Sequence, residues 1–190
     1  MTLILCLLTA CGGSSSGPAA TVTPPPTVEQ EEYAVLSALI RQNPVGYDLG
    51  DVVVIRQQTA VSDDAMLDRT LEERPGLPQD LVDSYRSRNA AAYTLEAKLR
   101  LDLDYALLSQ TDYEELFGDG QGKWADFEAQ YPGTRGWVSL SRVGLTADGD
   151  QPLVLMGFRC PGLCGAGGLY LLFREDGDWK VQDSLMEWMS

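Results

Sequence analysis

Four regularly spaced apolar runs occupy the last third of the chain, and they constrain its fold more than any other feature of the sequence. The runs span residues 137–145, 152–159, 169–174 and 179–185. The segments between them hold Asp-Gly pairs at 148–149 and 176–177 and a glycine-rich stretch at 161–168. Because Asp-Gly between apolar runs is a strong hairpin signal, we expect an antiparallel meander of four strands. The segment 153–156 is apolar on both faces, which predicts a central strand.

Helices and two further strands are predicted in the segment that precedes these runs. Apolar residues at helical period and capping boxes that begin at Thr27 and Thr111 indicate helices over about 28–41, 62–74, 79–91, 111–117 and 124–131. A β-branched run at 51–55 and a strict apolar-charged alternation at 95–105 indicate strands. The predicted fold class is α+β. One globular domain over 28–190 has N-terminal helices packed on one face of an antiparallel sheet that ends in the four-stranded meander.

The first residues predict export and a lipid anchor. Residues 1–10 form an uncharged apolar run with the length of a signal-peptide core, too short to span a bilayer. The sequence Leu-Thr-Ala-Cys at 8–11 resembles the lipobox of bacterial lipoproteins, which implies that Cys11 carries acyl chains such as palmitate. Residues 11–27, rich in Gly, Ser and Pro, then form a tether. An ordinary cleavable signal and an unprocessed apolar N-terminus are the alternatives. No Lys or Arg precedes the run, so the sequence leaves open whether Met1 is the native start.

Composition excludes several classes of function. The chain has 28 acidic and 14 basic residues and a net charge of -14, which repels phosphate backbones, so no nucleic-acid partner is expected. It contains no histidine, which removes Ser-His-Asp and Cys-His catalysis. An enzyme of this sequence would depend on carboxylates, tyrosine, lysine or a thiol.

Cys160 and Cys164 are predicted to form a disulfide, because nearby thiols outside the cytoplasm are usually oxidised. Pro161-Gly162 provides the turn between them, and the glycines that follow at 165, 167 and 168 allow a positive φ. The C-x-x-x-C spacing does not match a redox motif, and a zinc site would need two more soft ligands. A calcium loop at 119–128 fails because Trp124 stands where glycine is required. We expect no metal and no cofactor.

Arg142 and Arg159 each interrupt an apolar run, and both are candidate site residues. An arginine that points into a sheet needs a carboxylate partner, and Asp183 or Glu187 on the last run can provide one. A structural ion pair is the favoured interpretation, and a ligand anchor is the alternative.

Four aromatic residues also fit two interpretations, a packed core or a sugar-stacking platform: Trp124, Phe127, Tyr131 and Trp137.

The C-terminal third also carries a resemblance. The segments S-L-S-R-V-G-L at 139–145, L-V-L-M-G at 153–157, L-C-G-A-G at 163–167, Y-L-L at 170–172 and W-K-V at 179–181 resemble a module of uncharacterised bacterial exported lipoproteins. The resemblance implies a shared fold and location, and it brings no established activity.

Together these features favour a binding or interaction module, lipid-anchored on the extracytoplasmic side of the cell membrane or outer membrane. Its expected partners are the bilayer, through the acyl chains on Cys11, and an envelope protein or small ligand. A carboxylate-dependent envelope hydrolase is the alternative, because 28 acidic residues offer many pairs. A thiol-disulfide protein is the second alternative.

Overall fold

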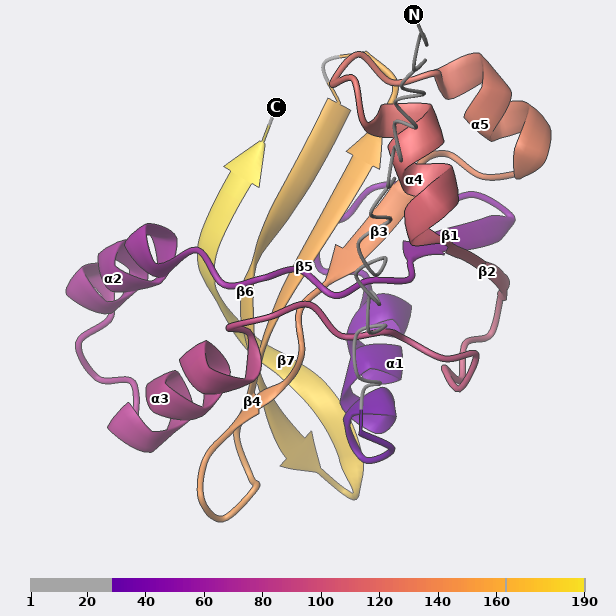
Figure 1. Cartoon of the computed structure of the whole chain (residues 1–190). Coiled ribbons are helices and arrows are strands. Elements are labelled where there is room, and N and C mark those ends of the chain that lie inside the picture. Colours follow the sequence, from indigo (N-terminus) through magenta and orange to yellow (C-terminus); the bar gives the residue numbers. More distant parts are fainter. Residues whose placement is uncertain (1–28, 163, 190) are drawn as a thin grey trace, which may run out of the picture.

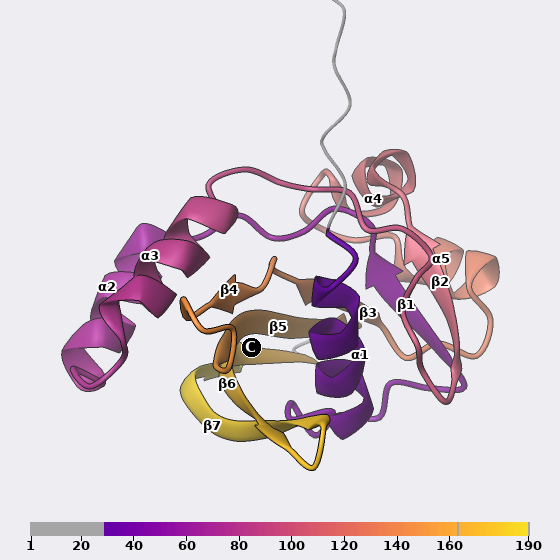
Figure 2. The same ribbon diagram turned by 90° about the horizontal axis from the view of Figure 1, so that it is seen from below.

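The computed structural model describes residues 29–162 and 164–189, apart from the side chains of Met186 and Glu187. Within this part of the chain, seven strands form a single mixed sheet, and five helices pack on its two faces (Figures 1 and 2). The helices are α1 (Glu32–Gln42), α2 (Asp64–Glu73), α3 (Gln79–Arg88), α4 (Gln110–Phe117) and α5 (Trp124–Gln130). The strands are β1 (Val52–Arg56), β2 (Asp104–Leu108), β3 (Trp137–Leu140), β4 (Gly144–Leu145), β5 (Pro152–Cys160), β6 (Cys164–Glu175) and β7 (Asp178–Met189).

The predicted signal peptide at 1–10, the lipidation site Cys11, the tether and the capping box at Thr27 lie outside the described residues. No helix among the residues that are described combines the length and the apolar character needed to cross a membrane.

One face of the sheet packs against α1. The helix buries an apolar stripe that includes Tyr33, Leu36 and Leu39 against side chains of β1, β3, β5 and β6. Leu36 and Leu39 are fully buried, and each contributes about 1.5–3 kcal/mol through the loss of apolar surface from water. This layer forms the largest core cluster of the described chain.

The opposite face carries two separate helix pairs. Apolar side chains of α2 and α3 pack on β5, β6 and β7 in one cluster, and those of α4 and α5 pack on β1 and β3 in another. Figure 1 shows α2 and α3 at the left and α4 and α5 at the upper right, with strands visible between them. Figure 2 shows the same two pairs at opposite ends of the sheet from below. None of the helices in the described residues therefore covers the strip of the sheet between the two pairs.

The strand order is β2-β1-β3-β5-β6-β7, with β4 paired to β5. The pairs β3–β5, β5–β6 and β6–β7 are antiparallel, as the spacing of the apolar runs predicts, and β5 is central. Two parts of the predicted arrangement are wrong. Strand β1 is parallel to both β2 and β3, so the sheet is mixed, and helices cover both faces of it. The fold class is mixed α+β.

The predicted strand at 95–105 is also wrong, because regular pairing begins only at Asp104. Residues 95–103 cross the edge of α1 instead. The Tyr33 hydroxyl accepts a hydrogen bond from the Glu96 amide at 2.7 Å, and the Ser37 hydroxyl accepts one from the Arg100 amide at 2.9 Å. The apolar alternation in this segment reflects burial of Leu95 and Leu99 beneath the helix, since helix side chains replace a neighbouring strand as hydrogen-bond partners.

Candidate functional site

Arg142 lies in a buried ion-pair cluster on the α1 side of the molecule. Its guanidinium Nε donates to Glu32 Oε1 at 3.1 Å, and its Nη2 also pairs with that carboxylate and with Glu29 Oε1, the latter at 3.1 Å. Arg142 is 4% exposed and Glu32 is 2% exposed. The predicted structural ion pair is therefore present, but its partners are Glu32 and Glu29, not the predicted Asp183. The side chain of Glu187, the other predicted partner, lies outside the described part of the chain. Asp183 pairs instead with Arg74 at 2.8 Å, because residue 183 faces α2.

This cluster joins three segments that are distant in sequence. Glu32 begins α1, and its second carboxylate oxygen accepts the Val143 amide at 2.8 Å. Asn89, just after α3, accepts the Arg142 amide at 2.7 Å and donates to the Arg142 carbonyl at 3.2 Å. The Tyr93 ring lies 4.1 Å from the Arg142 guanidinium. Every charged group in the cluster has a partner, which is the arrangement that makes a buried ion pair tolerable.

The pKa values in the cluster follow from these contacts. Burial alone would lower the pKa of Arg142, but hydrogen bonds and charge from Glu32 and Glu29 outweigh it and hold that pKa above its ordinary value. The hydrogen bond from Arg142 lowers the pKa of Glu29. Both shifts favour the charged pair.

Arg159 lies on the other face of the sheet, in the strip between the two helix pairs. The strand register places five side-chain positions there in one row, because residues paired across a sheet point to the same side. Continued by one residue beyond the Ile55–Val138 pair, the register of β1 and β3 places Arg56 beside Ser139. The row then runs through Gly157 on β5, Gly167 on β6 and Trp188 on β7. The two glycines leave space above the sheet, which the Trp188 indole fills, so the glycines and this ring together form the groove floor.

The glycines of this row make room for Trp188. A Cβ atom at Gly167 would lie 2.7 Å from the Trp188 Nε1 atom, and one at Gly157 would lie 3.3 Å from its Cζ2 atom. The Arg159 guanidinium lies over the indole, 4.6 Å from the ring centroid. The predicted positive φ at 165, 167 and 168 is wrong, since these glycines are strand residues of β6. At 167 the glycine is needed because the indole lies against the backbone.

A second arginine lies at the opposite end of the row. The Arg56 guanidinium lies 4.0 Å from the centroid of the Tyr113 ring on α4, and its Nη2 donates to Gln110 at 3.4 Å. The Arg56 Nε atom is buried with no hydrogen-bond partner, and so is the indole Nε1 atom of Trp137. Two donors beside the groove are therefore unsatisfied.

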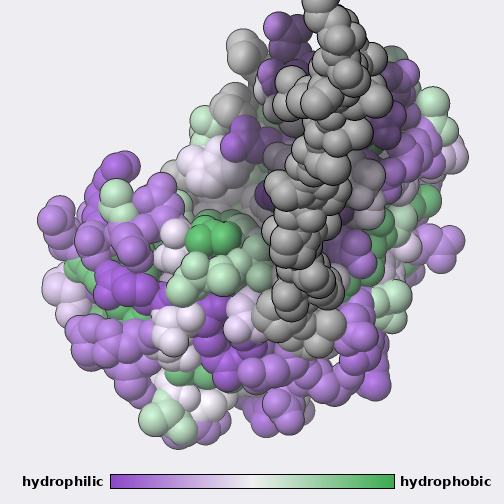
Figure 3. Space-filling model, in the orientation of Figure 1, coloured by the Kyte–Doolittle hydropathy of each residue, from purple (hydrophilic) through white to green (hydrophobic). Residues whose placement is uncertain are grey.

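The groove contains positive charge without negative charge. It has a cavity volume of about 620 Å³ and is lined by Arg56 and Arg159, by aromatic side chains of α4, α5, β3 and β7, and by Ser139 and Leu155. No Asp or Glu lines it among the described residues, although the chain has 28 of them. The other four hollows that we compared each include acidic side chains. In Figure 3, pale and green side chains lie to the right of α2 and α3.

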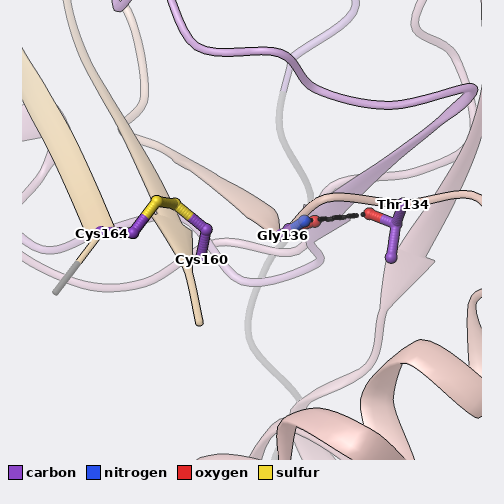
Figure 4. The surroundings of a disulfide bond; sticks show 4 residues. All are labelled: Thr134, Gly136, Cys160 and Cys164. Carbon is purple, nitrogen blue, oxygen red and sulfur yellow. Dashed lines mark hydrogen bonds between the residues drawn. A yellow bond between two sulfur atoms is a disulfide. The ribbon is translucent and has the colours of Figure 1, made fainter. Parts of the chain in front are cut away.

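Cys160 and Cys164 lie at disulfide-bonding distance at the tip of the β5–β6 hairpin, with their Cα atoms 5.1 Å apart (Figure 4). Gly162 between them has a φ of 78°, as the predicted Pro-Gly turn requires. Both cysteines line one end of the groove.

Figure 4 also shows the hydrogen bond from Thr134 Oγ1 to the Gly136 carbonyl at 2.7 Å, at the entry to β3. The backbone of Gly136 lies so close to the Arg159 carbonyl that a Cβ atom there would clash.

The four aromatic residues with two interpretations form a packed cluster. Phe127 and Trp137 are buried, and Trp124 and Tyr131 pack against them, with ring centroids 5.7 Å and 5.3 Å from that of Phe127. The core interpretation fits this arrangement, and a flat exposed platform does not.

Within the described part of the chain, no group of three or more Cys, Asp or Glu side chains is placed to hold a metal ion.

Sequence reasoning singled out Arg159 but missed Arg56, Tyr113 and Trp188. Arg56 ends the β-branched run of β1, and its spacing of two from Val54 places both on one face. That signal was present in the sequence. The contact between β1 and β3, which brings Arg56 to the groove, has no local signal.

Comparison of the chain with protein-family models, with curated proteins and with solved structures found no match.

Proposed function

We propose that this protein is a lipid-anchored, extracytoplasmic binding module, and that an anionic ligand occupies the groove between the two helix pairs. The observation that carries the proposal is the presence of Arg56 and Arg159 in a groove that no described carboxylate lines, in a chain of net charge -14. Arginines in such a chain readily find acidic partners, as Arg142 does. Two arginines that share one groove and have no acidic partner among the described residues favour a partner from outside the chain.

The residues around the two arginines orient their guanidinium groups in a way that suits an anionic ligand. Each guanidinium has an aromatic ring against its face, which orients the group and leaves N–H donors at its edge. A carboxylate or phosphate binds such an edge through two parallel hydrogen bonds. The Ser139 hydroxyl, which donates to the Gly157 carbonyl at a long 3.5 Å, adds a polar group to the lining of the groove. A hydrogen bond to a charged group contributes about 1.5–3 kcal/mol.

The two alternatives have less support. A carboxylate-dependent hydrolase needs two acidic side chains that converge on a substrate, and the groove has none among its described lining residues. A thiol-disulfide protein needs an accessible sulfur at a reactive position. Cys160 is 6% exposed, and Cys164, which is partly exposed, lies in a C-x-x-x-C hairpin tip that does not match the spacing or helix N-terminus of redox cysteines. We therefore retain the binding module as the proposed function.

The test is calorimetry on the full chain in detergent, with linear carboxylates and with their neutral amides as probes. Arg56→Ala and Arg159→Ala should each weaken carboxylate binding by about 10- to 100-fold. The matched control is Arg174→Ala. Arg174 also lies 4.6 Å from a tryptophan ring, that of Trp179, but outside the groove. Equal binding of the amides, or an equal loss in the Arg174 variant, would contradict the proposal.

The anchor has its own test, the intact mass of the protein purified from membranes. Added acyl mass on Cys11 and loss of residues 1–10 are expected from the lipobox resemblance. A mass that corresponds to an unmodified Cys11 would refute the anchor and leave the groove proposal unaffected.

A further inference from the structure

The two arginines of the groove lie on different strands, and the distance between them limits which ligands can contact both. We infer that the ligand carries two carboxylates joined by an uncharged flexible segment, one bound by Arg56 and the other by Arg159. The inference rests on the proposed function, because it names the ligand class of the same groove.

The sheet geometry sets the separation of the two arginines. Arg159 pairs with Trp137 across β3 and β5, whereas Arg56 lies beside Ser139, two residues further along β3. Two strand spacings of about 4.8 Å and one two-residue step of about 6.7 Å place their Cα atoms roughly 12 Å apart. One guanidinium stacks on α4 and the other on β7. They do not converge on one point, so a single carboxylate cannot bridge them.

The charge of the groove favours carboxylates over phosphates. Each guanidinium supplies one positive charge, which one carboxylate balances. A phosphate monoester carries about 1.5–2 negative charges near pH 7. Two of them would leave an excess of negative charge in a protein that already carries -14.

The two aromatic rings that stack on the arginines already have other contacts. Trp188 lies between the Arg159 guanidinium and the backbone of Gly167. Tyr113 has Arg56 over its ring and the edge of Trp137 against it, with the ring centroids of Tyr113 and Trp137 5.5 Å apart. A ligand ring has no free aromatic face of these two residues to stack on. The middle of the ligand instead meets the Ser139 hydroxyl and the Leu155 side chain, which suits a short saturated chain.

The experiment is a titration of the full chain in detergent with linear dicarboxylates from succinate to sebacate. Each diacid is compared with its monoamide, which has the same length and one charge fewer. We expect one chain length to bind best, and to bind at least about 10-fold more tightly than its monoamide. Arg56→Ala and Arg159→Ala should each abolish that advantage and leave the two probes equal. Arg174→Ala is the control and should preserve it.

The outcomes separate this inference from the proposed function. If diacids and monoamides bind equally to the unaltered protein, and both depend on Arg56 or Arg159, the groove binds an anion and the two-carboxylate ligand is wrong. If a bisphosphonate of the same length binds more tightly than the diacid, the carboxylate assignment is wrong. If no probe binds in any arm, the proposed function fails together with the inference.

Discussion

Arginines on the two faces of the sheet have opposite surroundings. On the α1 side, Arg142 is buried against Glu32 and Glu29, and its backbone is held by Asn89. On the groove side, Arg56 and Arg159 stack on aromatic rings and have no acidic partner among the described residues. The same residue type thus completes the fold in one place and is available to a ligand in the other. Stacking on an aromatic ring occurs in both regions, so the acidic partners and the deeper burial of Arg142 distinguish the two roles.

This difference predicts opposite consequences for substitution. Removal of Arg142 leaves the buried carboxylate of Glu32 without its main partner, which is costly. Removal of a groove arginine leaves no carboxylate of the described chain unpaired and affects mainly the ligand. Stability and binding should therefore separate between the two faces.

The largest expected effect is on the α1 side. Arg142→Ala should lower the free energy of unfolding by up to about 3–5 kcal/mol, because the buried Glu32 carboxylate loses its main partner and keeps only Arg88, at 3.1 Å, as a charged one. Urea denaturation of the full chain measures it. The matched control is Arg159→Ala, which should cost no more than about 1 kcal/mol, the worth of an exposed cation-π contact. Equal losses for the two variants would break the comparison.

The next effect tests the groove floor. Gly167→Ala should destabilise the protein by about 1–3 kcal/mol, because its Cβ atom meets the Trp188 indole and the Met156 carbonyl. It should also displace Trp188 and weaken carboxylate binding. Gly76→Ala is the control, since no atom lies within 4 Å of a Cβ there. Unchanged stability and binding in the Gly167 variant would contradict the account of the floor.

The disulfide should matter moderately, and only near the groove. A bond that closes so short a loop contributes about 2 kcal/mol in the chain-entropy account. Reduction should therefore lower the free energy of unfolding by that amount and leave the Arg142 cluster intact. The double variant Cys160→Ser with Cys164→Ser should show the same loss and no response to reductant. If reductant still lowers the free energy of unfolding of the double variant, the effect of reduction does not come from this disulfide.

The smallest effect is the pH dependence of the α1-side cluster. The pKa of Glu29 is lowered below its ordinary 4.5 by Arg142, so its contribution to stability is complete above about pH 4.5. The contribution is lost as the pH falls through the lowered value. Glu29 is half exposed, so the amount should stay below about 1 kcal/mol. Glu29→Gln should remove this part of the acid dependence, and an unchanged dependence in that variant would exclude Glu29 as its source.

Sequence reasoning succeeded where structure depends on local pattern. The antiparallel strands β5, β6 and β7 and the turn at Gly162 follow from apolar runs and turn residues a few positions apart. All five predicted helices have counterparts within a few residues of the expected bounds. α4 is capped by Ser109, two residues before the predicted cap at Thr111.

It failed where structure depends on distant contacts. The partner of Arg142 is Glu32, 110 residues away, and nothing in either local sequence links them. The groove requires β1 to lie parallel beside β3, a pairing between strands about 80 residues apart that no turn signals. The alternation at 95–105 is typical of a strand, but side chains of α1 take the place of a neighbouring strand as hydrogen-bond partners. Candidate site residues on a single strand could be found, but not the row that joins them.

The most direct test of the central claim is an NMR titration of side-chain N–H groups in the full chain with a linear dicarboxylate. One sample reports on both groups of arginines, through the Nε–H signals of Arg56, Arg159, Arg142 and Arg174 and the indole signals of Trp137, Trp188 and Trp179. We expect saturable shifts at Arg56, Arg159, Trp137 and Trp188, with Arg142, Arg174 and Trp179 unchanged. Shifts of similar size at Arg174 and Trp179, or none at Arg56 and Arg159 at saturating ligand, would contradict the claim that the acid-free groove is the binding site.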